Sequence, residues 1–142
     1  MQSILMASKV GIREESEGTN MFIIDWEFAQ FGHRAYDLGQ MIGDLCERKH
    51  FNNDSPSAEQ VLQGLITGYG PVTREMAFRT AIHAGIHLIC WYIRRAPDSP
   101  LPYPIEQATR LIELGRDFVV KGWNADRDWF QDSMLAPLFN GS

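Results

Sequence analysis

The chain has 142 residues, a formal net charge of −5 and no run of lysine and arginine, which argues against a partner bound through a phosphate backbone. Its apolar and charged shares, 44% and 22%, are typical of a protein with a buried core. No apolar run reaches the roughly 20 residues that span a bilayer. We therefore expect one domain, or one lobe of a larger one, that binds neither nucleic acid nor membrane.

The cysteine content predicts a reducing compartment. Cys46 and Cys90 are the only cysteines, and they form neither a CxxC motif nor a disulfide framework. The first residues do not show the charged segment, apolar core and cleavage site of a signal peptide. Together these features predict a cytoplasmic protein.

The first 25 residues are expected to form a β-hairpin. Apolar residues gather at 4–10 and again at 21–24, and the second run is apolar enough to be buried on both faces. The charged, turn-rich stretch 14–20 separates the two runs. Two strands cannot build a sheet with its own core, so the hairpin must pack against helices or pair with another strand.

A helical period begins at Asp37, which is expected to cap the first helix. The spacing of the apolar residues that follow, at i, i+3, i+4, i+7 and i+8, gives a clean buried stripe. A Pro-rich stretch at 96–104 cannot be helical. The stripe consists of Leu38, Met41, Ile42, Leu45 and Cys46, and further helices are predicted at about 57–69, 73–95 and 105–122, with a last short one near 129–139.

Three carboxylates in the stretch 24–39 carry a chemical hypothesis. Asp25 comes directly after the expected buried apolar strand, Glu27 lies two residues further along, and Asp37 is at the start of the expected helix. A hard cation such as Mg²⁺ prefers carboxylate oxygens that are held rigidly, with positions left open for phosphate and water. In the simpler interpretation, Asp25 is a turn residue, Glu27 is solvated and Asp37 only caps a helix. Spacing alone does not separate the two interpretations.

The run from Ile24 to Leu38 resembles the metal-binding segment of the aminoglycoside phosphotransferase/choline kinase superfamily, the small-molecule relatives of protein kinases. The pattern I-D-W-E-x-A-x-x-G-x-x-x-x-D-L is matched at every position. The residues from Glu27 to Gly39 are also similar to the methylthioribose kinase branch, although Trp26 replaces the proline of that branch. Over the remaining residues the likeness lies only in the order and size of the helices.

The resemblance implies a fold that is mainly α with a small N-terminal β-hairpin, as in the C-terminal lobe of a protein-kinase-like fold. The hairpin would occupy 1–25, the metal-binding loop 26–36 and the helices 37–142, in a single domain. Asp25 would bind the Mg²⁺ that bridges the phosphates of ATP, and Glu27 would support the metal or the substrate. Asp37 would be structural, accepting hydrogen bonds from the catalytic loop.

The implied reaction is transfer of the γ-phosphate of ATP to a hydroxyl of a small molecule. The catalytic loop of the family, H-G-D-x-x-x-x-N, precedes the hairpin, so Ser3 falls where the asparagine that ligates metal is expected. The base would then lie before residue 1. We expect a truncated chain without kinase activity of its own, with an exposed lobe interface that promotes self-association.

Two alternatives use the same residues differently. A lobe without a catalytic base would be a non-catalytic binding or interaction module. A carboxylate-metal hydrolase would need Asp25, Glu27 and Asp44 to converge. Asp44 is explained more simply by an ion pair with Arg48 at i,i+4.

Two side-chain groups farther along have a structural and a functional interpretation. The face of the long helix that carries His83, His87 and Cys90 has zinc-ligand types, but packing or hydrogen bonding is favoured because no fourth ligand is evident. An aromatic cage for a quaternary ammonium group is the second idea, and core packing is again favoured. Its candidates are Trp91, Tyr92, Trp123 and Trp129.

Overall fold

A computed structural model describes residues 31–52, 56–90 and 103–140 of the chain. Of these, 81% are helical and none is in a strand, so the described part is all-α. The predicted fold class, mainly α with a β-hairpin, is therefore wrong for it. Every element here follows the helical period, and none alternates with the period of two that a strand needs. Residues 1–25, where the hairpin was expected, lie outside the described residues.

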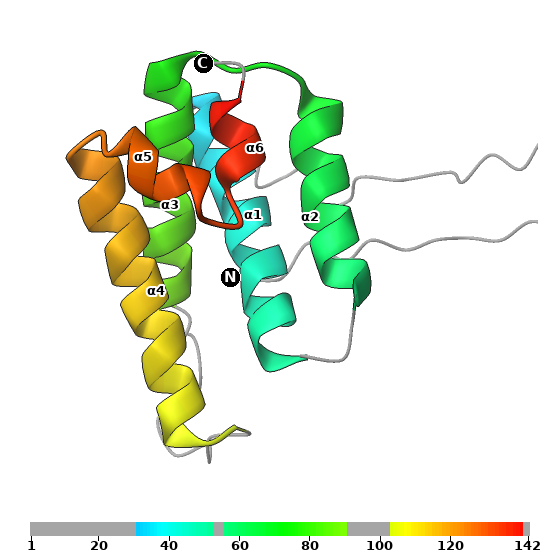
Figure 1. The fold of residues 1–142 in the computed structure, drawn as a ribbon, viewed down its shortest axis with the longest axis vertical. Helices are drawn as coiled ribbons and strands as arrows, with labels where there is room; N and C mark the ends of the chain where they lie inside the picture. The colour runs from blue at the N-terminus through cyan, green and yellow to red at the C-terminus, as the bar shows by residue number, and fades with distance from the viewer. Residues whose placement is uncertain (1–30, 53–55, 91–102, 141–142) are drawn as a thin grey trace, which may run out of the picture. The chain divides into compact units, whose positions relative to one another are not determined.

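Four helices lie side by side in the order α2, α1, α3, α4, and two short helices, α5 and α6, cross one side of them near one end (Figure 1). Residues 33–142 form one compact unit. The helices are α1 (Arg34–Phe51), α2 (Pro56–Tyr69), α3 (Arg74–Cys90), α4 (Ile105–Trp123), α5 (Arg127–Gln131) and α6 (Ala136–Phe139).

The first helix begins three residues earlier than the sequence suggested. Its N-cap is His33, whose Nδ1 accepts a hydrogen bond from the backbone N–H of Ala35 at 3.2 Å. Asp37 therefore lies inside the first turn and does not cap the helix. The predicted apolar stripe is confirmed at Leu38, Ile42 and Cys46, all of which are buried.

Helix α3 is the centre of the bundle, with α1 packed on one side and α4 on the other. Glycines permit both contacts. A Cβ placed on Gly43 of α1 would lie 2.6 Å from the Cβ of His87, and one on Gly85 of α3 would clash with the carbonyl oxygen of Gly115 in α4. The helices thus approach nearly backbone to backbone at both interfaces, which explains why α3 has buried residues on more than one face.

Phenylalanine side chains anchor the two short helices on the long ones. Phe130 of α5 stacks on Phe139 of α6 with ring centroids 4.6 Å apart, and Phe139 lies 5.0 Å from Phe78 of α3. Arg127 adds a hydrogen bond from Nη2 to the carbonyl oxygen of Phe139, at 2.8 Å. Because Phe118 of α4 is also fully buried here, α5 and α6 close the core at one end of the bundle.

The opposite end is held by contacts between the end of α1 and the start of α4. The Nε2 of His50 lies 2.7 Å from the carbonyl oxygen of Gln107, and the Nε2 of Gln107 donates to the carbonyl oxygen of His50 at 2.9 Å. Phe51 and Tyr103 stack with their centroids 3.9 Å apart. In the described part of the chain, no helix has both the length and the apolar character to cross a membrane.

Replacing Gly85 with alanine should lower the free energy of unfolding by about 1–3 kcal/mol, because the added methyl group meets the backbone of α4. Gly64→Ala in α2 is the matched control, since nothing lies within 4 Å of that position. The control should gain up to about 1 kcal/mol from helix propensity. Urea unfolding of both variants measures the difference, and equal stabilities would contradict the close α3–α4 contact.

Thr80 is fully buried in α3, and its Oγ1 has no hydrogen-bond partner among the described residues. A buried hydroxyl without a partner costs free energy that a methyl group does not. Thr80→Val should therefore raise the free energy of unfolding by about 1 kcal/mol. Thr109→Val is the control, because its exposed hydroxyl donates to the carbonyl oxygen of Ile105. A Thr80→Val variant less stable than the wild type would show that the hydroxyl is satisfied in solution.

Candidate functional site

The motif from Ile24 to Leu38 is described only in its last part. Asp25, Glu27 and Ser3 lie outside the described residues, so their roles in binding metal and nucleotide stay predictions. Asp37 is exposed in the first turn of α1, where a carboxylate interacts favourably with the positive end of the helix dipole. Its proposed partner, the catalytic loop, is not among the described residues, so its structural role also stays a prediction.

The end of the motif is fixed in the core. Leu38 is 2% exposed, and Gly39 is buried against α3, where a Cβ would lie 2.5 Å from the Cβ of His83. The ring of Tyr36 meets the ring of His83 edge to face at a centroid distance of 5.4 Å. The first turn of α1 is thus held against α3.

His83 is the titratable group at this contact. Burial lowers its pKa from the usual 6.5, and the nearby charges of His33 and Arg79 lower it further. An imidazole with a lowered pKa is neutral at neutral pH. The motif therefore ends in the first turns of α1, beside a histidine that is neutral at neutral pH.

Acid should destabilise the fold through His83. The unfolded chain binds a proton at this residue more readily than the folded chain does, so stability is lost as the pH falls below about 6.5. The His83→Gln variant should lose less stability than the wild type between pH 7 and pH 5. Urea unfolding across that range gives the comparison, and NMR titration of the ring should show a midpoint below 6.5. A midpoint at or above that value would contradict the assignment.

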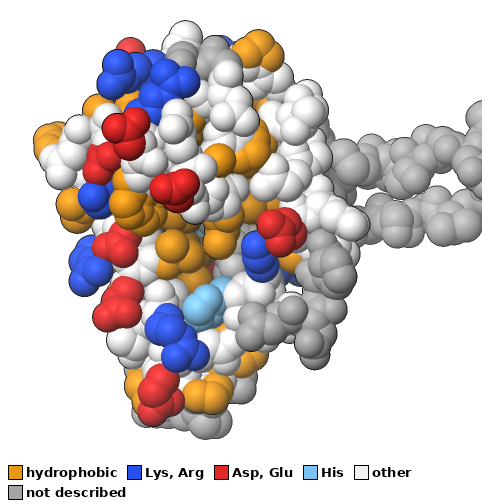
Figure 2. Space-filling view, in the orientation of Figure 1, with side chains coloured by type: hydrophobic (Ala, Val, Ile, Leu, Met, Phe, Trp, Pro, Cys, Tyr) orange, Lys and Arg blue, Asp and Glu red, His pale blue; other side chains and the backbone are white. Residues whose placement is uncertain are grey.

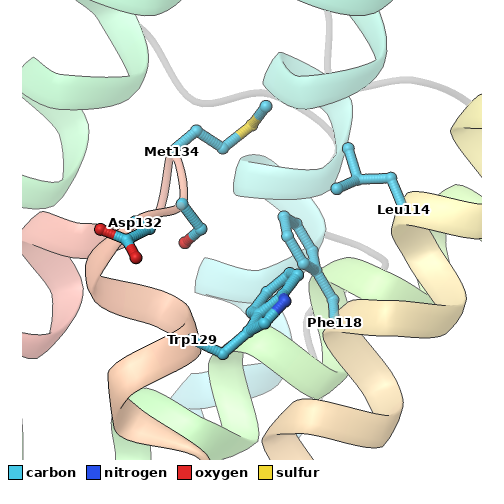
Figure 3. Close-up of a pocket in the computed structure, with 6 residues that line it drawn as sticks. Leu114, Phe118, Trp129, Asp132 and Met134 are labelled. Atoms are coloured by element: carbon cyan, nitrogen blue, oxygen red, sulfur yellow. The ribbon is translucent and has the colours of Figure 1, made fainter.

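A groove of about 450 Å³ lies between α4 and the α5 region. Trp129 lies edge to face against Phe118 at 6.1 Å, and Met134 and Leu114 project toward each other from opposite sides (Figure 3). Asp132 and Ser133 complete its lining. Apolar side chains gather over the same part of the surface (Figure 2). Concave, mainly apolar surfaces of this size suit small ligands. Sequence analysis missed the groove because its walls come from two helices and a turn that meet only in the fold.

The proposed aromatic cage does not form from its two described members. Trp123 is 82% exposed at the end of α4. Trp129 packs against Phe118 and Phe130, and the Nζ of Lys121 lies 6.0 Å from the centroid of its ring. Packing is therefore confirmed for Trp129, whereas Trp123 is on the surface. The other two candidates, Trp91 and Tyr92, lie outside the described residues.

The two histidines of α3 are held separately rather than as a zinc pair. His83 contacts Tyr36, and the Nδ1 of His87 lies 2.9 Å from the Oε1 of Gln40. The interpretation of these histidines as packed or hydrogen-bonded residues is confirmed. The predicted ion pair is also present, with the Nε of Arg48 2.7 Å from the Oδ2 of Asp44.

Comparison with known proteins finds a similarity to a phosphotransferase. The chain is similar to the phosphotransferase FrzJ of Cladobotryum sp, with 34% identity over 117 residues, or 82% of this chain. The chain spans about 29% of the length of that relative. No protein-family profile matches the chain, and no solved structure matches it. The similarity supports a relationship to phosphotransferases but does not distinguish the aminoglycoside/choline kinase superfamily from the methylthioribose kinase branch.

Proposed function

We propose that this chain supplies the metal-binding part of a phosphotransferase that moves the γ-phosphate of ATP to a hydroxyl of a small molecule. The similarity to a phosphotransferase over 82% of the chain carries the proposal. The motif from Ile24 to Leu38 adds the chemistry, because it places two carboxylates, Asp25 and Glu27, in one short segment. Their oxygens form a donor set that suits Mg²⁺.

In phosphoryl transfer the protein mainly positions groups and neutralises charge. Asp25 would hold Mg²⁺ against the phosphates of ATP, and Glu27 would orient that site or the substrate. The metal, when bound, neutralises charge on the phosphates. In the described fold, Leu38, the last residue of the motif, is buried, and Gly39 beside it packs against α3.

Turnover also needs a base for the acceptor hydroxyl. The His-Gly-Asp triplet that would supply it in the resembling family does not occur in the 142 residues. We therefore expect this chain on its own to bind Mg²⁺-ATP without transferring phosphate to an acceptor.

Calorimetric titration with ATP tests this proposal. Heat of binding should require Mg²⁺, and Asp25→Asn should weaken binding at least about tenfold, because one charged metal ligand is lost. Glu75→Gln is the control, since Glu75 is an exposed carboxylate that pairs with Arg79 in α3. No Mg²⁺-dependent heat with the wild-type chain, or an equal loss in both variants, would contradict the proposal.

A non-catalytic binding module is the second candidate function. The groove lined by Leu114, Phe118, Trp129 and Met134 favours it, because a surface of that kind can bind a small apolar group without any catalytic residue. The titration above separates the two candidates. A module of this kind gives no Mg²⁺-dependent nucleotide signal.

A further inference from the structure

Three potential metal ligands meet on neighbouring turns of α1 and α3. Asp44 and Glu47 lie three residues apart on α1, so their side chains share one face of the helix. His87 of α3 faces them, and one ligand atom from each of the three residues lies within 4.8 Å of the other two. None of the three belongs to the motif from Ile24 to Leu38.

The position and orientation of His87 are fixed. Its side chain is 6% exposed and packs directly on Gly43, where a Cβ would lie 2.6 Å from its own. Its Nδ1 lies 2.9 Å from the Oε1 of Gln40. An amide oxygen only accepts hydrogen bonds, so Nδ1 is the donor in this contact. Such a second hydrogen bond is the usual support of a histidine that binds metal.

The Nε2 side of the His87 ring faces the carboxylates. Nε2 of His87 lies 3.4 Å from Oε2 of Glu47. That separation is longer than the roughly 2.7–2.9 Å of a charge-assisted hydrogen bond. It equals the spacing of about 3.4 Å that two ligands adopt when each lies about 2.0–2.2 Å from a tetrahedral zinc ion. The spacing of this ion pair therefore also fits two ligands that share one metal ion.

Asp44 contributes one carboxylate oxygen to the cluster. Asp44 accepts from Arg48 through Oδ2, and the second basic residue of this turn, Lys49, pairs with Glu59 at 2.8 Å. The side chains of Asp44 and Glu47 are 43% and 22% exposed. Water can therefore reach the cluster from the carboxylate side and complete the coordination of an ion.

We propose that Asp44, Glu47 and His87 bind a divalent transition-metal ion, with zinc as the representative cation. One imidazole nitrogen and two carboxylate oxygens suit zinc and its first-row neighbours, whereas Mg²⁺ prefers oxygen ligands alone. Three protein ligands leave a coordination position open for water. The ion would join α1 to α3 at their glycine contact.

Zinc titration of the folded chain tests the site. Calorimetry should show binding, and zinc should raise the melting temperature. Glu47→Gln and Asp44→Asn should each weaken zinc binding at least about tenfold, because each removes a charged ligand while keeping the shape of the side chain. Gln40→Met should weaken it by about 10–100-fold, the range seen when the hydrogen-bond partner of a metal-bound histidine is lost.

Two controls localise the binding. Glu75→Gln removes a charge from another i,i+4 ion pair and should leave the zinc affinity unchanged. Excess Mg²⁺ should not displace zinc. The proposal is overturned if the wild-type chain shows no zinc-dependent rise in melting temperature, or if Glu47→Gln and Asp44→Asn bind zinc as the wild type does.

Discussion

The close approach of α3 to both of its neighbours is the constraint on which the described structure depends. At Gly39 and Gly43 the histidines of α3 occupy the volume that side chains of α1 would fill, and at Gly85 and Gly115 the backbones of α3 and α4 nearly touch. Protein interiors are packed as densely as organic crystals, so these positions tolerate little change in volume. The register of α1 on α3 follows from these contacts.

That register has chemical consequences. Because α1 and α3 run in the same direction, Gly39 faces His83 and Gly43 faces His87, one turn apart on each helix. His83 is thereby placed beside Tyr36 and His87 beside Gln40. Glycine at these positions of α1 thus decides which polar residues of α1 each histidine meets.

Most helices were predictable from the sequence because their apolar residues recur with the helical period, as Leu38, Ile42 and Cys46 do. The start of α1 was not, because a histidine at position 33 supplies the cap where an aspartate was the more obvious candidate. The groove and the Asp44–Glu47–His87 cluster were missed for a common reason. Their members lie on different elements, whereas a sequence pattern groups His87 with His83 and Cys90 of its own helix.

The two metal hypotheses differ in donor chemistry, and this difference makes them separable. Asp25 and Glu27 offer oxygen alone, which suits a hard ion that keeps several waters and binds phosphate. The cluster on α1 and α3 includes an imidazole, which shifts preference toward zinc and related ions. Since α1 follows the first segment directly and carries two ligands of the second, an ion at the cluster would stiffen the helix on which the motif ends. The two proposed ions would therefore not compete for the same ligands.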